Sequence, residues 1–354
     1  MSLNRLRFLT AGESHGKGLT VVVEGFPAGL ALSEEYMVTD LARRQKGYGR
    51  GGRMLIEKDF AEIMAGVRQG YTLGSPIALW IQNKDWDNWK GPMSITKTEK
   101  APNKVTRLRP GHADLPGVLK YKQDDVRNIL ERASARETAA RVAVGAIARR
   151  FLDEFGIVIN AHVLSIGTVD ANIPEVIDWD KVEESPVRCA DPVAEKAMMA
   201  AIDDAKETGN TLGGVFEVVA VGLPIGLGSH IQWDTKLDGR IAQAMMSIHA
   251  IKGVEIGDGF GQTRLMGSKV HDIIVPWSEG GRKWRRRSNH AGGLEGGITN
   301  GMPVTVKAAI KPISTLKNPL PSVDLVTGET GQAHYERSDV CQVRHAQIDT
   351  EHTS

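Results

Sequence analysis

The sequence predicts a protein of the α+β class, in which helices and short strands are mixed along the chain. Apolar residues recur at steps of three and four over residues 139–155, which is the period of an amphipathic helix. Short apolar runs, typical of strands, occur in both halves of the chain. Both halves also follow the layout strand, connection, helix, strand, although they share no sequence repeat.

The individual elements follow from these patterns. Strands are expected at residues 6–9, 19–23, 76–81, 157–166, 212–221 and 303–311. Helices are expected at 33–44, where Ser33 is the predicted N-cap, at 195–205 and at 237–250. The last of these has Ile241, Ala244, Met245 and Ile248 on one face, and both Met245 and Met246 are interpreted as core residues. Residues 84–100 are interpreted as an irregular surface connection that could contact another subunit.

The helix at 139–155 is preceded by a possible anion site. Ser134 and Glu137 have the spacing of a capping box, and Gly156 stands where a C-terminal cap belongs. A helix start beside Arg132, Arg136 and Arg141 offers backbone N–H groups and guanidinium groups to a phosphate or carboxylate. The alternative is a helix that begins near residues 124–125 and runs through, with these arginines facing solvent.

Composition limits the classes of function. The 354 residues are 41% hydrophobic and 25% charged, with 44 basic and 43 acidic side chains, so no global charge favours nucleic acid or membrane. No apolar run is long enough to span a bilayer. Two cysteines, Cys189 and Cys341, do not make a disulfide framework, which favours a reduced cytoplasmic protein. Glycine is frequent, at 39 residues, and suggests tight turns or backbone close to a ligand.

Two basic segments are candidate anion sites. Residues 43–53 contain five cations and four glycines, and residues 282–287 contain five cations around Trp284. The first could fold around a phosphorylated or polycarboxylate ligand. An RNA-binding stretch and a solvated loop are the alternatives for it, and a solvated loop is the favoured interpretation of the second.

Two histidines lie in glycine-flanked loops. His15 lies in Gly12-Glu13-Ser14-His15-Gly16, between two predicted strands. His112 follows a Pro-Gly turn beside Arg109, and Asp114 is near enough to orient its imidazole. Histidines in such loops can exchange protons at neutral pH, although a turn histidine without function is the alternative. No Cys/His pair has metal-site spacing, so no metal is expected.

Five motifs together resemble the chorismate synthase family in order and spacing: Gly12 to Gly16, Arg109-Pro110-Gly111-His112-Ala113-Asp114, Glu131 to Thr138, Ser288 to Gly301 and Arg337-Ser338-Asp339. The resemblance covers about residues 4–341. It implies a carbon–oxygen lyase of the shikimate pathway of aromatic amino-acid biosynthesis. Such an enzyme converts 5-enolpyruvylshikimate 3-phosphate to chorismate and phosphate by anti-1,4 elimination. The family requires reduced FMN although the reaction has no net redox change.

The resemblance also implies residue roles. His15 donates a proton to the leaving phosphate, His112 manages the protonation of the reduced flavin, and Asp339 works with the flavin to remove the ring proton. The two histidine roles are interchangeable at this stage. The implied FMN pocket comprises Arg132, Ala133, Ser134, His249, Ala250, Gly296, Lys311, Pro312, Ile313, Ser314, Thr315 and Arg337.

Guanidinium groups match the phosphate and two carboxylates of that substrate. The candidates are Arg44, Arg50, Arg53, Arg109 and Arg136. Arg44 and Arg50 are alternatively assigned to a nicotinamide nucleotide, because some family members reduce their flavin with NADPH. The sequence has no nucleotide-binding fingerprint.

The implied fold is a single-domain β-α-β sandwich, with long central helices between two antiparallel sheets, assembled as a homotetramer. Helices at 125–155 and 237–250 would be among the inner ones. The family domain is expected to cover residues 1–341. Residues 342–354 depart from the family pattern, are polar, show no apolar helical face and are interpreted as a truncated or altered tail. We therefore expect a complete site but lower stability, because a covering helix that buries about 1,000 Å² of apolar area would be missing.

Two other classes compete with the lyase. One is an FMN oxidoreductase that consumes reductant in proportion to product. The other is a nucleic-acid binder that uses the basic segments at 43–53 and 282–287; we expect no tight binding of nucleic acid.

Overall fold

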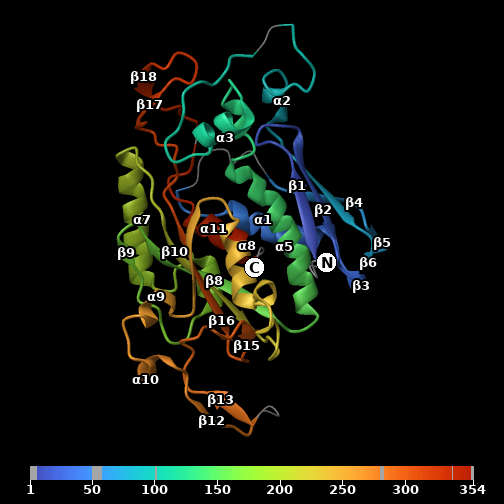
Figure 1. Ribbon diagram of the computed structural model, residues 1–354. Helices are drawn as coiled ribbons and strands as arrows, with labels where there is room; N and C mark the ends of the chain where they lie inside the picture. The colour runs from blue at the N-terminus through green and yellow to red at the C-terminus, as the bar shows by residue number, and fades with distance from the viewer. Residues whose placement is uncertain (1–5, 50–57, 100–101, 280–282, 337, 352–354) are drawn as a thin grey trace.

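Two antiparallel sheets enclose a layer of helices in the computed structural model, which describes residues 6–49, 58–99, 102–279, 283–336 and 338–351 (Figure 1). The first sheet has the order β1 (Arg7–Ala11), β2 (Gly18–Glu24), β7 (Ile77–Gln82) and β4 (Ala61–Ala65). The second has the order β11 (Ile251–Ile256), β16 (Val304–Ile310), β10 (Gly214–Val221), β8 (Val158–Ile166) and β9 (Val169–Asp170). The predicted α+β class and sandwich are confirmed.

Small sheets and hairpins extend this framework. A three-stranded sheet contains β3 (Ala28–Ala31), β6 (Tyr71–Leu73) and β5 (Val67–Arg68). The hairpins pair β12 (Ile274–Pro276) with β13 (Trp284–Arg286), β14 (Leu294–Glu295) with β15 (Ile298–Thr299), and β17 (Pro321–Val323) with β18 (Thr330–Gln332). The β12–β13 hairpin projects from the end of the molecule opposite to α3 (Asp114–Tyr121) (Figure 1).

The inner helix layer contains α1 (Glu34–Gln45), α5 (Thr138–Asp153) and α11 (Val343–Glu351). In α5, all residues from Thr138 to Ile147 except Arg141 are buried, because the helix lies between both sheets. Its end is closed by Gly156, whose φ of +68° and whose N–H bond to Asp153 O match the predicted glycine cap.

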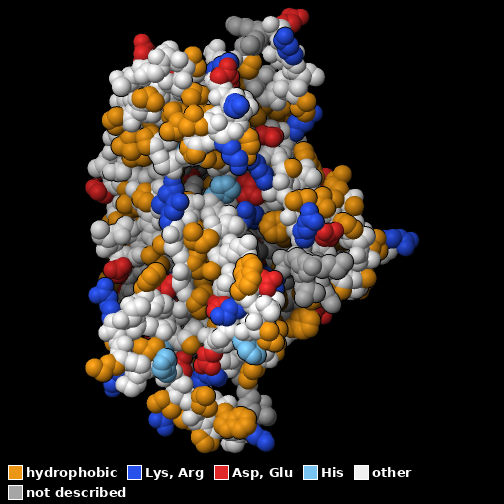
Figure 2. Space-filling model, viewed as in Figure 1, with side chains coloured by type: hydrophobic (Ala, Val, Ile, Leu, Met, Phe, Trp, Pro, Cys, Tyr) orange, Lys and Arg blue, Asp and Glu red, His pale blue; other side chains and the backbone are white. Residues whose placement is uncertain are grey.

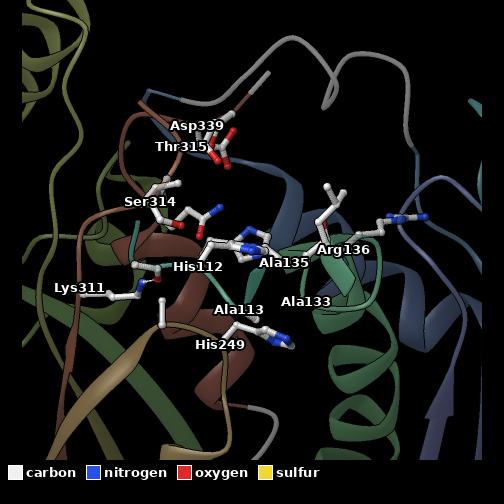
Figure 3. A pocket seen from close by; sticks show the side chains of 18 of the residues that line it. His112, Ala113, Ala133, Ala135, Arg136, His249, Lys311, Ser314, Thr315 and Asp339 are labelled. Atoms are coloured by element: carbon white, nitrogen blue, oxygen red, sulfur yellow. Dashed lines mark hydrogen bonds between the residues drawn. The ribbon is translucent and has the colours of Figure 1, made fainter. Parts of the chain in front are cut away.

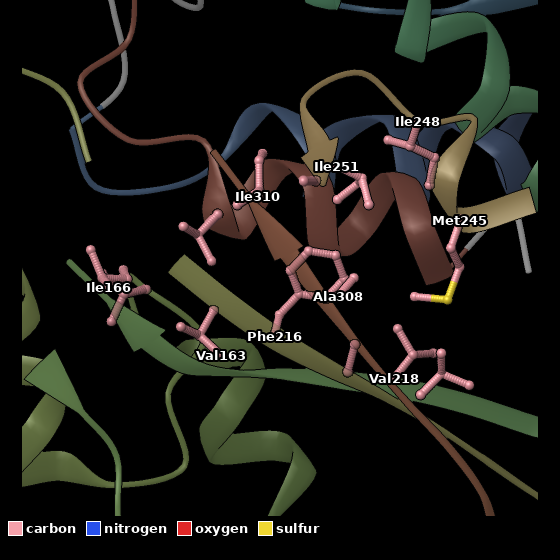
Figure 4. Close-up of a cluster of buried hydrophobic side chains, with 14 of the residues drawn as sticks. Val163, Ile166, Phe216, Val218, Met245, Ile248, Ile251, Ala308 and Ile310 are labelled. Carbon is pink, nitrogen blue, oxygen red and sulfur yellow. The ribbon is translucent and has the colours of Figure 1, made fainter. Parts of the chain in front are cut away.

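Two cores meet in this layer. One lies between the first sheet and α1 and α5, around Val21, Leu79 and Ile147. The other lies on the second sheet, where Phe216 packs among residues of α8 (Leu237–Met246), β11 and β16 (Figure 4). Ile348 of α11 belongs to the first core, and Val343 and Ala346 belong to the second. The α11 helix therefore joins the two cores.

Helices α6 (Trp179–Glu184) and α7 (Pro192–Glu207) follow β9 in the chain, and α7 lies along the outer side of the second sheet (Figure 1). Short helical turns lie at α2 (Trp86–Trp89), α4 (Arg127–Leu130), η2 (Ala135–Glu137), η3 (Trp233–Thr235), α9 (Gly259–Gln262) and α10 (Gly267–Val270). The expected helix at 125–155 is therefore wrong as one element: α4 ends at Leu130, and the chain turns before α5. The expected helix at 237–250 ends at Met246.

The expectation that a covering helix is missing after residue 341 is also wrong, because α11 spans Val343–Glu351. All nine residues of α11 are buried, although most of them are polar. Glu351 accepts hydrogen bonds from Arg43 at 2.8 Å, Arg149 at 3.1 Å and Arg188 at 2.7 Å. Hydrophobic periodicity could not reveal this helix, because most of its buried side chains are polar and are satisfied by charged partners instead of apolar contacts.

Candidate active site

A cavity of about 710 Å³ opens at the N-terminal end of α5. Its walls come from the β1–β2 loop, the start of α3, the turn before α5, the start of β11, the chain after β16 and residues 338–345. Figure 2 shows a hollow in this part of the molecule where basic, acidic and histidine side chains gather. In Figure 3, His112 lies between Asp339 and Thr315 on one side and His249 on the other.

His112 is held by a buried carboxylate and a guanidinium. Its Nδ1 lies 2.5 Å from Asp114 Oδ1, and Arg109 Nε donates to Asp114 Oδ2 at 2.9 Å. Burial raises the pKa of Asp114, but its bonds to His112 and Arg109 outweigh that effect and lower the pKa to about 2. Arg109 also donates to Thr315 Oγ1 at 3.1 Å, which ties this turn to the chain after β16. The predicted orientation of His112 by Asp114 is confirmed.

His15 is held by a second carboxylate. Its backbone N–H and its Nδ1 both bond to Glu131, at 2.8 Å and 2.9 Å respectively, and Arg127 donates to the same carboxylate at 2.8 Å. The ring of Trp89 stacks on the imidazole with a centroid distance of 3.9 Å. The loop can turn here because Gly12 has a φ of +115°, and a Cβ at that position would lie 2.4 Å from Gly18 O.

Two arginines of the pocket are anchored from behind. Arg136 Nη1 donates to Asp59 Oδ1 at 2.5 Å, and its Nε donates to Asn83 Oδ1 at 2.9 Å. Arg44 is 2% exposed, lies 3.5 Å from Asp59 and bonds to Thr138 and the carbonyl of Ala135. Asp59 thus holds both guanidinium groups at the pocket wall.

The opposite side of the cavity carries Lys252, Lys311 and His249 beside Ile248, Ile251 and Pro312. Burial, aided by the charge of Lys252, lowers the pKa of Lys311. Burial also lowers the pKa of His249, although Glu137 at 3.5 Å opposes this shift. A cationic end beside an apolar surface suits a ligand that is anionic at one end and flat at the other.

Most of the residues expected at the site line this one cavity: His15, His112, Asp339, Ala133, Ser134, His249, Ala250, Lys311, Pro312, Ile313, Ser314, Thr315, Arg44, Arg109 and Arg136. Arg132 and Gly296 do not line it. Arg132 instead donates to the carbonyls of Thr10 and Gly12, and Gly296 lies in the β14–β15 turn. Arg50, Arg53 and Arg337 lie outside the described residues.

The predicted anion site at the helix start is only partly reproduced. Ser134 caps η2 by accepting from the N–H of Arg136, but the Glu137 carboxylate binds Thr10 and Arg141 and does not complete a capping box. Of the three arginines, Arg136 alone is among the residues lining the cavity.

Several site residues had no signal of their own in the sequence. Lys252, Glu336, Gln342 and His345 line the cavity, as does Met246, which is 47% exposed and is not a core residue. Glu131 was part of a quoted motif, and its spacing of four from Arg127 is the only local hint of their ion pair.

Two features are absent from the described part of the chain. It contains no group of three His, Cys, Asp or Glu residues placed to hold a metal ion. Within the same ranges, no helix combines the length and apolarity needed to cross a membrane.

The chain is similar to known proteins along almost its whole length. The family model described as "Chorismate synthase" matches residues 6–353. A chorismate synthase of Aquifex aeolicus is 59% identical, over 98% of this chain and 90% of that protein. One of Moorella thermoacetica is also 59% identical, over 97% of this chain and 89% of that protein.

A solved structure described as "Crystal Structure of Chorismate Synthase" has a TM-score of 0.76 and 48% identity, over 98% of this chain and 88% of that one. These matches extend over almost the whole chain. The chain belongs to the chorismate synthase family, the lyases that form chorismate in the shikimate pathway.

Proposed function

We propose that the cavity binds 5-enolpyruvylshikimate 3-phosphate together with reduced FMN and there releases phosphate. The observation that carries this proposal is that His15, His112 and Asp339, which are distant in the chain, line one cavity. The substrate carries a phosphate and two carboxylates, and the same cavity presents Arg44, Arg109, Arg136, Lys252 and Lys311.

Each of the three residues has a proposed role in proton transfer. His15 donates a proton to an oxygen of the leaving phosphate, which makes phosphate a better leaving group. His112, fixed by Asp114, holds a proton at the flavin ring. Asp339 assists removal of the ring proton of the substrate. The geometry favours these residues as a set, and it would equally serve an exchange of the two histidine roles.

The residues around the cavity fit a flavin mononucleotide. Ile248, Ile251, Pro312 and Ile313 offer apolar surface to a flat ring, and Lys252 and Lys311 offer charge to a phosphate. We assign Ala133, Ser134, His249, Ala250 and Lys311–Thr315 to FMN binding. When bound, reduced FMN would supply reversible one-electron chemistry, which would account for a cofactor without net redox change.

NADPH is a proposed reductant of the flavin. Its nucleotide would need a surface outside the cavity that is proposed for the substrate and FMN. Arg44, one of two residues expected to contact it, is 2% exposed and lies 3.4 Å from Asp349 in addition to its contact with Asp59. Arg44 also lines the cavity proposed for the substrate, which argues against its holding a dinucleotide as well.

A homotetramer is the proposed assembly. Several strands of the N-terminal sheets carry exposed apolar side chains. The exposed fraction is 62% for Leu9, 61% for Met64 and 54% for Tyr71. Surfaces of this kind are often covered by another subunit. Light scattering of the purified protein tests the assembly.

A cytoplasmic location is also proposed, in keeping with two buried free cysteines.

Anaerobic phosphate release from the substrate with photoreduced FMN tests the function. A lyase releases many phosphates for each flavin, whereas an oxidoreductase consumes reductant in proportion to product. Tight binding of nucleic acid in a filter assay with a salt series would favour the other competing class. That outcome is not expected, since Arg43 pairs with Glu183 and Glu351 and Arg286 pairs with Glu295.

A further inference from the structure

His15 and His112, two of the histidines that line the cavity, are each backed by the same kind of assembly, a buried carboxylate that is itself bound by an arginine. For His112 the pair is Asp114 and Arg109. For His15 it is Glu131, 2% exposed in its side chain, and Arg127. The two assemblies differ in one component. The indole of Trp89 stacks on His15, and the described ring contacts include no such partner for His112.

We propose that Glu131 and Trp89 are positioning residues for His15, which select its tautomer and the plane of its ring so that Nε2 is the atom that exchanges a proton with the leaving phosphate. This inference rests on the proposed role of His15. Neither Glu131 nor Trp89 is among the residues lining the cavity, so both act through the imidazole.

The carboxylate determines the tautomer. An ionised carboxylate only accepts hydrogen bonds, and the Nδ1 of His15 lies 2.9 Å and 3.0 Å from its two oxygens. Nδ1 must therefore carry a hydrogen in both protonation states, and Nε2 is the nitrogen that gains or loses one. Proton donation from Nε2 to a phosphate oxygen then leaves a neutral imidazole that still donates from Nδ1 to Glu131.

Glu131 is fixed by two further donors. Arg127 Nη1 donates to Oε1 at 2.8 Å, and the backbone N–H of His15 donates to Oε2 at 2.8 Å. The carboxylate therefore contacts the backbone and the ring of the same residue. That double contact limits rotation of the imidazole about its first side-chain torsion.

The indole fixes the ring plane. Trp89 stacks on His15 at 3.9 Å between centroids with 28° between the planes. Its Nε1 donates to Asp85 Oδ2 at 3.0 Å, and the guanidinium carbon of Arg127 lies 5.0 Å from the indole ring. The indole is thus held at its edge, and its face fixes the plane of the imidazole that donates the proton. The segment that was expected to be only a surface connection therefore supplies a positioning residue, Trp89, in this proposal.

A double-mutant cycle on phosphate release separates positioning from general structural support. Glu131→Gln should lower kcat by roughly 10- to 100-fold, part of the about 10²- to 10⁴-fold that a placed proton donor contributes, with KM changed by less than about threefold. In a His15→Ala background the same substitution should cost less than about twofold, because its target is gone. Equal losses in both backgrounds would overturn the proposal, since Glu131 would then only support the loop.

Trp89 is tested by comparing an aromatic with an aliphatic replacement. Trp89→Phe should keep most of kcat, whereas Trp89→Leu should lower it by roughly tenfold. Trp86→Leu, in the same short helix and without a described ring contact to His15, is the matched control and should keep its activity. Equal activity of the Phe and Leu variants at position 89 would remove the indole from the proposal.

Nitrogen-15 NMR of the histidines gives a measurement that needs no variant of Glu131. The His15 signal, assigned by its loss in His15→Gln, should show a protonated Nδ1 in the neutral ring; a protonated Nε2 would overturn the proposal. A wild-type protein that binds substrate but releases no phosphate contradicts the proposed function instead, and the NMR result still decides the tautomer.

Discussion

His112 Nδ1 and Asp114 Oδ1 lie 2.5 Å apart, in a turn where the histidine and its carboxylate are separated by a single residue. Arg109 closes the turn by donating to both oxygens of Asp114, at 2.9 Å and 3.1 Å. One short segment thus carries a histidine, its orienting carboxylate and the counter-charge of that carboxylate. Single substitutions in this segment therefore test the histidine and its carboxylate separately.

His112→Ala should slow phosphate release by about a hundredfold or more, the usual scale for an acid–base residue, while FMN still binds. Anaerobic phosphate release and a flavin fluorescence titration measure the two properties separately. The exposed His271, outside the cavity, provides the control: His271→Ala should behave as wild type. Unchanged turnover in His112→Ala would count against the proposed site.

Asp114→Asn should remove part of the acid dependence of stability. Because the pKa of Asp114 is lowered to about 2, its ionised form stabilises the fold fully above pH of about 4, and that contribution is lost as the pH falls towards about 2. The shift corresponds to about 2 kcal/mol. Urea unfolding between pH 2 and 7 measures it.

The wild-type protein should lose more stability than Asp114→Asn over that window. Glu336 also has a pKa of about 2, because bonds and charges from His334, Arg127 and Arg109 outweigh the effect of its burial, and it is present in both proteins. The difference between the two curves therefore isolates Asp114. Parallel curves would show that Asp114 does not titrate as described.

Asp59→Ala should destabilise the protein by roughly 3–5 kcal/mol, because it leaves Arg44 and Arg136 buried without the carboxylate between them. Chemical denaturation measures the loss. Asp87→Ala is the matched control, since Asp87 forms an exposed pair with Lys90 and its loss should cost less than about 1 kcal/mol. Equal losses in both variants would show that burial does not strengthen the pair.

Glu351→Gln should also destabilise the fold strongly, by roughly 3–5 kcal/mol, since Arg43, Arg149 and Arg188 converge on this carboxylate. Glu154→Gln, which alters an exposed pair with Arg150, serves as the comparison. Thermal unfolding of both variants tests whether α11 is part of the folded unit. A Glu351→Gln protein as stable as wild type would mean that the α11 contacts contribute little.

Residue patterns were sufficient wherever chemistry is local. The glycine-flanked loops around His15 and His112, the orientation of His112 by Asp114 and the apolar face of the helix ending before Gly156 all involve residues close in the chain. The resemblance to the family predicted the sandwich fold and most of the residues that line the cavity. Such features depend on spacing, turn chemistry and periodicity, which a sequence displays directly.

Long-range pairing was decided only by the tertiary structure. Sequence could not show that Glu131 would hold His15 across 116 positions, or that Asp59 would hold Arg44 and Arg136. Nor could it show that the polar α11 would be buried between the two cores, or that Arg132 would bond to the β1–β2 loop and not line the cavity. A charged side chain shows the same letter whether solvent or a buried partner satisfies it, and only the packing of the two sheets determines which partner it meets.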